Sequence, residues 1–374
     1  MFLITNRRID ESKHGVNKLL KIPNEKGPNE LRVVEATRSR GKWTIDVLPD
    51  VLMKGTDDRE LNKINEQRTK LGLAPGDRAT GGDIMFLRLL PIVNPRRISP
   101  NSRKKGTDVL LFVHGFNNTP EEILNRCEGL AQTYGVEVVA FSWPSNGGGL
   151  KGVPDYLDDK RDAQASVVAF DRVVAIAHQM IELARASFIS DLEKELKADA
   201  TLSGEEMHAI LAIEAEKHCP FRVSMMLHSM GNYLLERTLK SSALRGQLLV
   251  FDNIIMAAAD VNNPGHASWL EQLQTRNRLY VTINEDDNAL RASRMKGGDE
   301  QLARLGHHRR ELYASNATYV DFTDAPKVGS SHAYFEGTPI QNKNVRSFFD
   351  RAIHGKRAEQ LLKFDPVTNT HRIR

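Results

Sequence analysis

Short apolar runs alternate along the chain with segments whose apolar residues recur at helical spacing. A short run rich in apolar and β-branched residues is typical of a buried strand, whereas a spacing of three to four residues predicts a helix with one buried face. The runs predicted to be strands are LRVVEA (31–36), WTIDVL (43–48), IMFLRLLPI (84–92), DVLLFVH (108–114), VEVVAFSW (136–143), RVSMMLH (222–228), NIIMAAA (253–259), RLYVTIN (278–284) and ATYVDFT (317–323). This alternation predicts an α/β fold, a mostly parallel sheet with helices on both faces.

Capping residues mark the start of a helix at three places. Thr119-Pro120-Glu121-Glu122 combines an N-cap, a proline at the first helical position and a capping-box glutamate. Similar signals occur at 203–206, where a serine precedes two glutamates, and at 338–341, where a proline follows a threonine. We expect a helix to begin at each place. The first should bury the face made by Ile123, Leu124, Cys127, Leu130, Ala131 and Tyr134.

The length of the chain allows one large domain or two, and we expect a single domain over residues 1–374. Residues 1–106 supply N-terminal strands, and within them the polar, weakly periodic interval 49–83 predicts an irregular surface excursion. Residues 144–219 begin with a serine- and glycine-rich stretch and continue as long helical patterns. They form either a helical cap that covers a pocket at the carboxyl edge of the sheet, or ordinary helices on a sheet face.

A strand, a sharp turn and a helix are predicted in immediate succession at FRVSMMLHSMGNYLLERTLK (221–240). The apolar run stops at His228-Ser229-Met230-Gly231, and the helical pattern begins directly after it. A serine on such a turn is lifted clear of the sheet, and the helix N-terminus beneath it offers backbone N–H groups to an oxyanion. Ser229 is therefore the candidate nucleophile.

A second strand ends beside a capped helix at DVLLFVHGFNNTPEE (108–122). In hydrolases that carry their serine on a strand-to-helix turn, such a loop supplies the second oxyanion donor. Gly115 lets the backbone turn closely, so the predicted oxyanion hole consists of the N–H groups of Phe116 and Met230. Loss of one such donor costs about 3–4 kcal/mol in other hydrolases, which makes this loop almost as important as the serine.

A serine nucleophile needs a base, and His332 is the candidate because it stands on the loop after the last predicted strand. The other histidines are expected to have different roles. His307 and His308 are expected on an exposed segment, and His266 in a different connection. His114 and His228 are expected to support the two turns through hydrogen bonds.

Three motifs, each at a strand end, carry a family resemblance: HGFNN (114–118), FSWPSNG (141–147) and HSMGN (228–232). In this order they resemble the α/β-hydrolase superfamily and, more narrowly, a poorly characterised bacterial branch of serine hydrolases with the same FSWPS element. The resemblance covers about residues 107–350. It implies an α/β-hydrolase fold with about eight strands and the chain order nucleophile, acid, histidine. The superfamily turn is G-x-S-x-G, and here Leu227 replaces the first glycine, which normally relieves crowding between strand and helix.

The acid is expected after the strand at 278–284, where Glu285, Asp286 and Asp287 stand together. The resemblance favours Asp287, because the branch has an aspartate before a short apolar turn at this strand end. Asp286 is the second candidate. Asp260, directly after the preceding strand, is the third, because some hydrolases place their acid there.

Composition changes this picture little. Hydrophobic residues make up 40% of the 374, enough for a large core, and the net charge of +4 is too small to indicate a nucleic-acid partner. The two cysteines, Cys127 and Cys219, lack metal-ligand spacing and are too few for a disulfide framework, and Cys127 is expected in the core. Early arginines and the lack of an apolar run of about 20 residues predict a cytoplasmic protein without a signal peptide or membrane span.

The sequence therefore predicts a serine hydrolase that cleaves an ester-like bond of a small-molecule acyl substrate, resembling carboxylesterases and lipases, through Ser229, His332 and Asp287. No metal or cofactor is implied, and neither the substrate nor the oligomeric state follows from the sequence. The alternative is a hydrolase-fold protein that binds or scaffolds with little turnover, because a fold alone does not establish a function.

Overall fold

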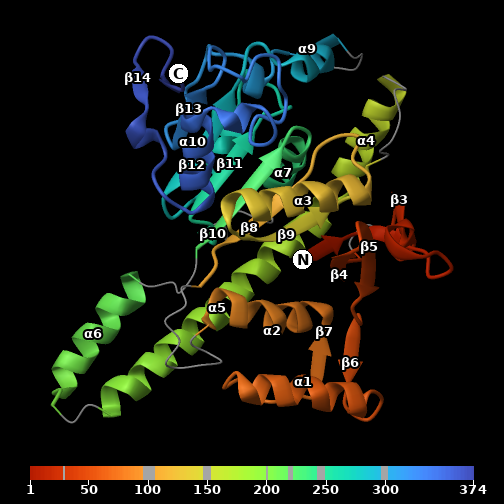
Figure 1. The fold of residues 1–374 in the computed structure, drawn as a ribbon, viewed down its shortest axis with the longest axis vertical. Helices are drawn as coiled ribbons and strands as arrows, with labels where there is room; N and C mark the ends of the chain where they lie inside the picture. Colours follow the sequence, from red (N-terminus) through yellow and green to blue (C-terminus); the bar gives the residue numbers. More distant parts are fainter. Residues whose placement is uncertain are drawn as a thin grey trace.

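A mixed eleven-stranded sheet forms the centre of the computed structural model (Figure 1). The structure describes residues 1–27, 30–95, 106–145, 153–198, 201–217, 222–241, 249–295 and 302–374. The strands are β1 (Phe2–Thr5), β2 (Arg7–Ile9), β3 (Leu19–Pro23), β4 (Arg32–Ser39), β5 (Lys42–Val47), β6 (Val51–Met53), β7 (Arg78–Thr80), β8 (Val109–Val113), β9 (Glu137–Ser142), β10 (Val223–His228), β11 (Asn253–Ala257), β12 (Arg278–Ile283), β13 (Ala317–Asp321), β14 (Lys363–Asp365) and β15 (Thr370–Arg372). The helices are α1 (Asp58–Lys70), α2 (Gly81–Val93), α3 (Pro120–Tyr134), α4 (Val153–Ala165), α5 (Val167–Ala198), α6 (Gly204–Lys217), α7 (Gly231–Lys240), α8 (Ala267–Leu270), α9 (Asn288–Met295) and α10 (Lys343–Ile353).

The strand order in the main sheet is β14-β15-β13-β12-β11-β10-β8-β9-β1-β4-β5. The run from β15 to β1 is parallel, whereas β14, β4 and β5 pair antiparallel at the two ends. The predicted α/β class and mostly parallel sheet are therefore confirmed. The expected number of about eight strands describes the parallel part alone, because β14, β4 and β5 extend the sheet through antiparallel pairing.

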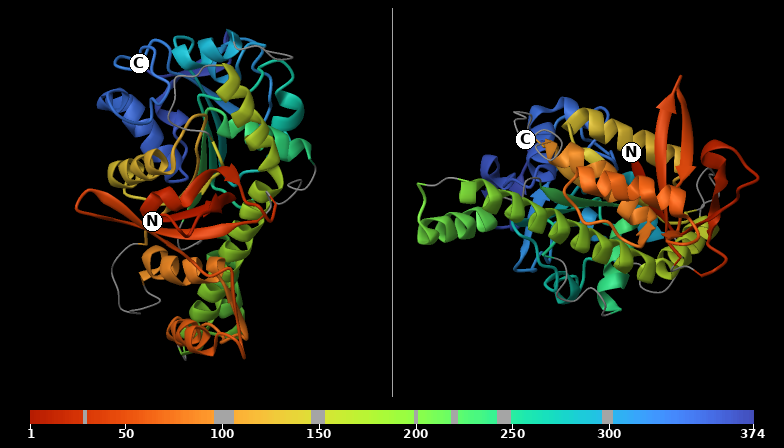
Figure 2. Two further views of the ribbon diagram at one scale, coloured as in Figure 1. Left: turned by 90° about the vertical axis from the view of Figure 1, so that its right-hand side faces the viewer. Right: turned by 90° about the horizontal axis from the view of Figure 1, so that it is seen from below.

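Helices cover both faces of this sheet (Figures 1 and 2). Alternate residues of β8 point to opposite sides, as the pleat of a strand requires. Leu111 and Val113 belong to an apolar core shared with α2, α5 and α7, whereas Leu110 and Phe112 belong to a second core shared with α3 and α10. Burial on both faces explains why the central strands read as continuous apolar runs rather than alternating ones.

The run 84–92, predicted as a strand, is instead part of helix α2. Periodicity cannot separate a short buried strand from a helix that is apolar on most sides. The deciding signal lies just upstream, where Thr80 and Asp83 form a reciprocal capping box: the Thr80 N–H donates to Asp83 Oδ2 at 2.7 Å, and the Asp83 N–H donates to Thr80 Oγ1 at 3.2 Å. The other predicted strands correspond to β4, β5 and β8 to β13.

Two further corrections concern the N-terminal region. Residues 49–83 are not irregular, because they contain the antiparallel strand pair β6 and β7, the whole of α1 and the start of α2. Strand β1, which was not predicted, lies inside the sheet, parallel to β9 and antiparallel to β4. The excursion escaped prediction because α1 buries only Leu61 and Ile64 and so has a weak apolar pattern.

The predicted helix starts agree with the structure at two of three places. Thr119 caps α3 and Ser203 caps α6, each through a capping box with the glutamate three residues later. At the third place a short 3-10 turn spans Pro339–Gln341, and α10 begins only after Asn342, whose side chain accepts the N–H groups of the first turn. Cys127 is fully buried in the core as expected, and burial raises the pKa of its thiol to about 12. Cys219 lies outside the described residues.

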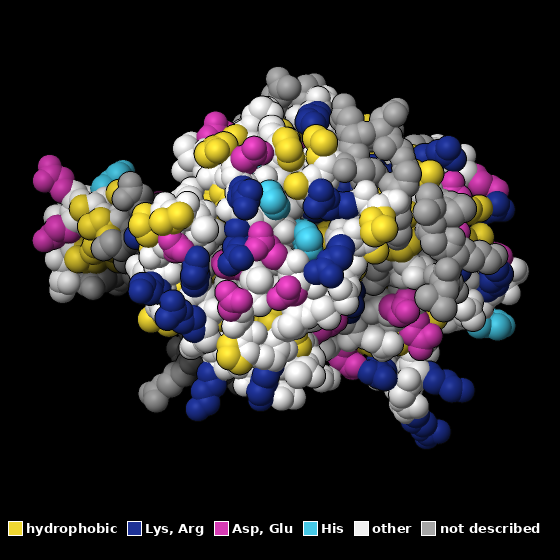
Figure 3. Space-filling view, turned by 90° about the horizontal axis from the view of Figure 1, so that it is seen from above, with side chains coloured by type: hydrophobic (Ala, Val, Ile, Leu, Met, Phe, Trp, Pro, Cys, Tyr) yellow, Lys and Arg dark blue, Asp and Glu magenta, His cyan; other side chains and the backbone are white. Residues whose placement is uncertain are grey.

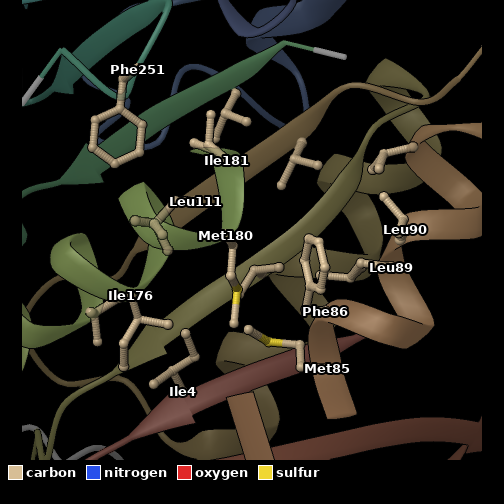
Figure 4. Close-up of a pocket in the computed structure, with 16 residues that line it drawn as sticks. Ile4, Met85, Phe86, Leu89, Leu90, Leu111, Ile176, Met180, Ile181 and Phe251 are labelled. Atoms are coloured by element: carbon tan, nitrogen blue, oxygen red, sulfur yellow. The ribbon is translucent and has the colours of Figure 1, made fainter. Parts of the chain in front are cut away.

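An apolar cavity of about 80 Å³ lies between the sheet and helices α2 and α5 (Figure 4). Met85 and Met180 reach into it from the two helices, and Val109 and Val223 line it from the first residues of β8 and β10. The cavity therefore lies toward the amino edge of the parallel strands, opposite the edge where β10 leads into Ser229.

A partly buried ion pair joins three elements at the same amino edge. The His354 Nδ1–H donates to Asp108 Oδ2 at 2.6 Å, and the Nε2–H donates to the Tyr134 carbonyl at 2.9 Å. Because both ring nitrogens donate, this arrangement requires the protonated imidazole. The hydrogen bond that His354 donates to Asp108 raises the pKa of His354 above its ordinary value, despite partial burial.

We expect His354→Gln to lower the free energy of unfolding by about 1–2 kcal/mol in mild acid. The folded pKa exceeds the unfolded pKa of about 6.5, so this contribution is fully present below pH 6.5 and is lost as the pH rises through the folded pKa. Chemical denaturation at pH 6 and pH 9 measures it, with exposed His14→Gln as the control. An equal loss at both pH values would contradict the prediction.

Candidate active site

Ser229 occupies the turn between β10 and α7 in a strained backbone conformation. Its φ is +54°, a region that residues other than glycine rarely adopt. The turn is held because the Ser229 N–H donates to the Ala257 carbonyl at 3.0 Å, and the Ser229 carbonyl accepts the N–H of Asn232 at 3.0 Å. Strain of this kind is typical of a serine that projects its hydroxyl from a strand-to-helix turn.

Two glycines allow the chain to approach this turn closely. A Cβ on Gly115 would lie 2.7 Å from the Ser229 Cβ, and a Cβ on Gly231 would lie 2.9 Å from the carbonyl oxygens of Val113 and His114. Leu227, at the position where the superfamily motif has glycine, instead pairs in register within β10 and is fully buried in the core. The close contacts of this turn are thus made at Gly115 and Gly231, not at residue 227.

His332 and Asp287 are joined by a hydrogen bond. The His332 Nδ1–H donates to Asp287 Oδ2 at 2.7 Å, and the Asp287 side chain is fully buried whereas the His332 side chain is 25% exposed. The second carboxylate oxygen, Oδ1, accepts the N–H groups of Ala289 and Leu290 at the start of α9. A carboxylate held at both oxygens can fix the orientation and tautomer of the imidazole.

The loop that carries His332 is anchored by Asn284, a residue that the sequence analysis passed over. Its Nδ2 donates to the carbonyls of Gly329 at 2.9 Å and Ser331 at 3.1 Å. Asn284 directly follows β12 and stands three residues before Asp287, so one strand end positions both Asp287 and the loop that carries His332. The signal that could have identified it was an asparagine as the last residue of the strand predicted at 278–284.

The other two candidate acids face elsewhere. Asp286 is exposed at the surface. Asp260 is buried and forms an ion pair with Arg304, with Nε and Oδ1 3.0 Å apart, and it accepts the Tyr156 hydroxyl at 3.0 Å. Of the three carboxylates considered, Asp287 is the one that contacts His332 in the described part of the chain.

His332 lies beside the residue that precedes Ser229. The rings of His228 and His332 have centroids 4.6 Å apart, and the His228 Nε2–H donates to the His332 carbonyl at 3.2 Å. Across the described ranges, no hydrogen bond joins the Ser229 hydroxyl to His332. Catalytic hydrogen bonds are often long in the absence of substrate and shorten only in the complex.

His114 and His228 are neutral supports rather than bases. Burial lowers the pKa of His114 to about 3 and holds that of His228 well below its ordinary value. His114 donates from Nδ1 to the Gly115 carbonyl at 2.9 Å and stacks on Trp143, with ring centroids 5.0 Å apart. Their hydrogen bonds match the supporting role predicted for both residues.

Of the remaining histidines, His266 has a structural role and His307 lies near Asp287. His266 bonds to the Asn263 carbonyl and the Tyr319 hydroxyl, each at 2.6 Å. His307, expected on an exposed segment, is only partly exposed. Burial lowers the pKa of His307, and the nearby Asp287 carboxylate opposes that effect.

The loop with the predicted oxyanion donor Phe116 is held by side chains from distant segments. Asn118 bonds from Nδ2 to the carbonyls of Gly115 and Phe116, and its Oδ1 accepts from Arg126 at 3.1 Å. The Asn117 N–H donates to Asp159 Oδ2, on α4, at 2.9 Å. Met230, the second predicted donor, directly precedes α7, where the first backbone N–H groups of a helix lack acceptors within the helix.

Arg7, which follows β1, is the main support of this loop and was not foreseen. It is fully buried, and its guanidinium donates to the Asn118 carbonyl at 3.3 Å, the Ser145 carbonyl at 3.3 Å and Ser142 Oγ at 3.0 Å. Burial lowers the pKa of Arg7 to about 10, an effect that Asp159 opposes, so it stays charged at neutral pH. A buried cation with this many acceptors holds the loop rigidly.

The FSWPSNG motif now has a structural explanation. The Ser142 hydroxyl and the Ser145 carbonyl accept hydrogen bonds from the Arg7 guanidinium, and the Ser145 hydroxyl donates to the Asn118 carbonyl at 2.8 Å. The Trp143 indole donates to the His114 carbonyl at 3.0 Å. The motif therefore connects β9 to the loop that follows β8, and its last two residues, 146 and 147, lie outside the described part.

The interval 144–219 divides into helices with different surroundings. Helix α4 contacts the loop that follows β8, since the Tyr156 ring lies against Phe116 with centroids 5.6 Å apart. Helix α5 packs on α2 and α7 over a sheet face, and α6 packs on α5 away from the sheet (Figures 1 and 2).

Charged side chains surround the carboxyl end of the sheet. Figure 3 views the molecule from the end where α9 lies, and histidine side chains occupy the middle of this face among basic and acidic ones. In the described residues no group of three or more His, Cys, Asp or Glu side chains is placed to hold a metal ion. Nor does any helix in those ranges have both the length and the apolar character that a membrane crossing requires.

Comparison with known protein families agrees with the fold. Residues 96–339 match the family described as alpha/beta hydrolase of unknown function (DUF900), which is more than half of the chain. The matched range contains Gly115, Ser229, Asp287 and His332, whereas Arg7 precedes it. No curated protein matches the chain.

Proposed function

Because the chain belongs to this family of alpha/beta hydrolases, we propose that it is a serine hydrolase that cleaves an ester-like bond of a small-molecule substrate. One observation carries the proposal: Ser229 stands in a strained turn, and His228, the residue before it, packs against a histidine that is itself bonded to a buried carboxylate. The supporting facts are the φ of +54° at Ser229 and the 2.7 Å bond between His332 and Asp287. Such a set of groups has the roles of nucleophile, base and orienting acid.

In the proposed reaction, His332 Nε2 takes the proton of the Ser229 hydroxyl as Oγ attacks the carbonyl carbon of the ester. Asp287 keeps the Nδ1 proton in place and stabilises the imidazolium. Collapse of the tetrahedral intermediate breaks the bond to the alcohol, which leaves with the proton from His332. Water then gives a proton to His332, attacks the acyl group and releases the acid, and Ser229 regains its proton.

The oxyanion of each intermediate would bind to the N–H groups of Phe116 and Met230. The hydrogen bonds of Arg7, Ser145 and Asp159 to this loop support the assignment, because preorganised donors need no rearrangement as charge develops. Helix α4 would form one wall of the substrate pocket through Tyr156, which already covers Phe116. This role as a partial cap is specific to α4, since α5 and α6 lie elsewhere.

Labelling with a fluorophosphonate tests the proposal. We expect the wild-type protein to form a covalent adduct on Ser229, identified by mass spectrometry of the modified peptide, and Ser229→Ala to remain unlabelled. Ser268→Ala is the matched control because this serine is exposed and distant in sequence. Absence of labelling, or labelling unchanged by Ser229→Ala, would favour the binding or scaffolding alternative instead.

A further inference from the structure

Two cations lie close to one aromatic ring at the interface between α4 and α7. Lys160 Nζ lies 4.8 Å from the centre of the Tyr233 ring, and the Arg237 guanidinium carbon lies 4.8 Å from the same centre. Lys160 belongs to α4, whereas Tyr233 and Arg237 stand one helical turn apart on α7. Both cations are partly buried.

Neighbouring carboxylates are already engaged by other cations. Asp260 pairs with Arg304 at 3.0 Å, and Glu236 pairs with Lys240 at 2.7 Å. Within the described ranges, neither Lys160 nor Arg237 forms a salt bridge, and Arg237 Nε is a buried donor without a hydrogen-bond partner. Buried donors in folded proteins are nearly always satisfied by protein groups, water or a ligand, so this one is available to a bound acceptor.

The pKa of Lys160 supports the same conclusion. It is lowered by burial and by the positive charges of Arg304 and Arg237, while Asp260 and Glu236 act in the opposite direction. An anion placed beside Lys160 would offset both the lost hydration and the repulsion between the cations.

This cluster adjoins the candidate active site. Tyr233 stands one helical turn after Ser229 at the start of α7. Tyr156 links the two places, since Lys160 Nζ lies 5.8 Å from its ring centre and the same ring contacts Phe116 at 5.6 Å. A group bound between Lys160 and Arg237 would therefore lie beside the oxyanion loop.

We propose that Lys160 and Arg237 bind an anionic group of the substrate, a carboxylate or a phosphate, beside the ester to be cleaved. An ammonium and a guanidinium offer donors only, so they recognise acceptors that carry negative charge. This inference rests on the proposed hydrolase function and narrows its substrates to esters that carry a negative charge in the acyl or the alcohol part.

Paired esters of equal length test the inference. The p-nitrophenyl monoester of glutaric acid ends in a carboxylate, whereas p-nitrophenyl valerate ends in a methyl group. We expect the ratio of their kcat/KM values, glutarate over valerate, to fall about tenfold to a hundredfold in Lys160→Met and Arg237→Leu, and to be largely kept in Lys160→Arg. Arg161→Met is the control, because Arg161 is exposed on the same helix and its side chain pairs with Asp158.

Calorimetric titration with inorganic phosphate is a second test, which measures anion binding without any need for hydrolysis. Weaker phosphate binding in Lys160→Met than in Arg161→Met, with the ester ratio unchanged, would place the anion in the alcohol part. If both the ratio and phosphate binding match those of Arg161→Met, the anion site is wrong. If neither ester is hydrolysed and Ser229 is not labelled, the hydrolase proposal itself fails, whatever the phosphate result.

Discussion

Replacing Asp287 with asparagine is expected to lower kcat about 10⁴-fold while the protein stays folded. The buried carboxylate accepts the Nδ1–H of His332 at 2.7 Å, which leaves Nε2 free to take the proton of Ser229. An asparagine can present its amide nitrogen to His332, and this donor favours the wrong tautomer of the imidazole. Its oxygen can still accept the Ala289 and Leu290 N–H groups, so the start of α9 is preserved.

Steady-state kinetics of the single and double variants measure this effect. His332→Ala is expected to lower kcat about 10⁶-fold. Adding Asp287→Asn to this variant should lower kcat little further, because the acid acts only through the histidine. Asp286→Asn is the matched control, since this neighbouring carboxylate is exposed. Activity of Asp287→Asn within tenfold of wild type would show that the acid lies elsewhere, with Asp260 as the next candidate.

Adding a single methyl group in Gly115→Ala is expected to lower kcat about 10²-fold to 10³-fold, the loss that follows removal of one oxyanion donor. The new Cβ would lie 2.7 Å from the Ser229 Cβ, closer than such atoms approach in folded proteins, and 3.0 Å from the His228 carbonyl oxygen, a tight contact. The loop must therefore move, and the N–H of Phe116 moves with it. Arg7 and Asp159 oppose this shift, so the strain falls on the turn that carries Ser229.

Comparison of two alanine variants separates this effect from a general loss of stability. Gly129, inside α3, has open space where a Cβ would stand, and alanine there should leave kcat unchanged and slightly stabilise the helix. Both variants are assayed for kcat and for the rate of fluorophosphonate labelling. If Gly115→Ala reacts as fast as Gly129→Ala, the loop does not supply an oxyanion donor.

The central strands and the serine turn could be read from the sequence because their signals are local. Apolar runs at 108–114, 222–228 and 278–284 mark β8, β10 and β12, since burial on both faces requires continuous apolar residues. The turn at Ser229 and the capped helix after residue 119 carry their signals within a few residues. The error at 84–92 has the same cause, because a short apolar run fits a buried helix equally well.

The residues that hold the candidate site in place could not be predicted from local sequence signals. Arg7 bonds to Ser142, 135 residues away in the chain, and it gives no motif beyond an arginine after an unpredicted strand. Lys160 and Arg237 likewise become neighbours only where α4 packs against α7. A charged residue read from sequence is expected at the surface, and only packing shows which ones are buried.

By itself the sequence determined the alternation of strands and helices, the turn at Ser229 and a short group of possible acids, because each depends on residues close together in the chain. Tertiary structure alone decided that Asp287 contacts His332, 45 residues away, and that Asp260 is engaged by Arg304. The reason is physical: hydrogen bonds and ion pairs depend on distances of about 3 Å. The parallel sheet sets those distances when it brings the ends of separate strands to one edge.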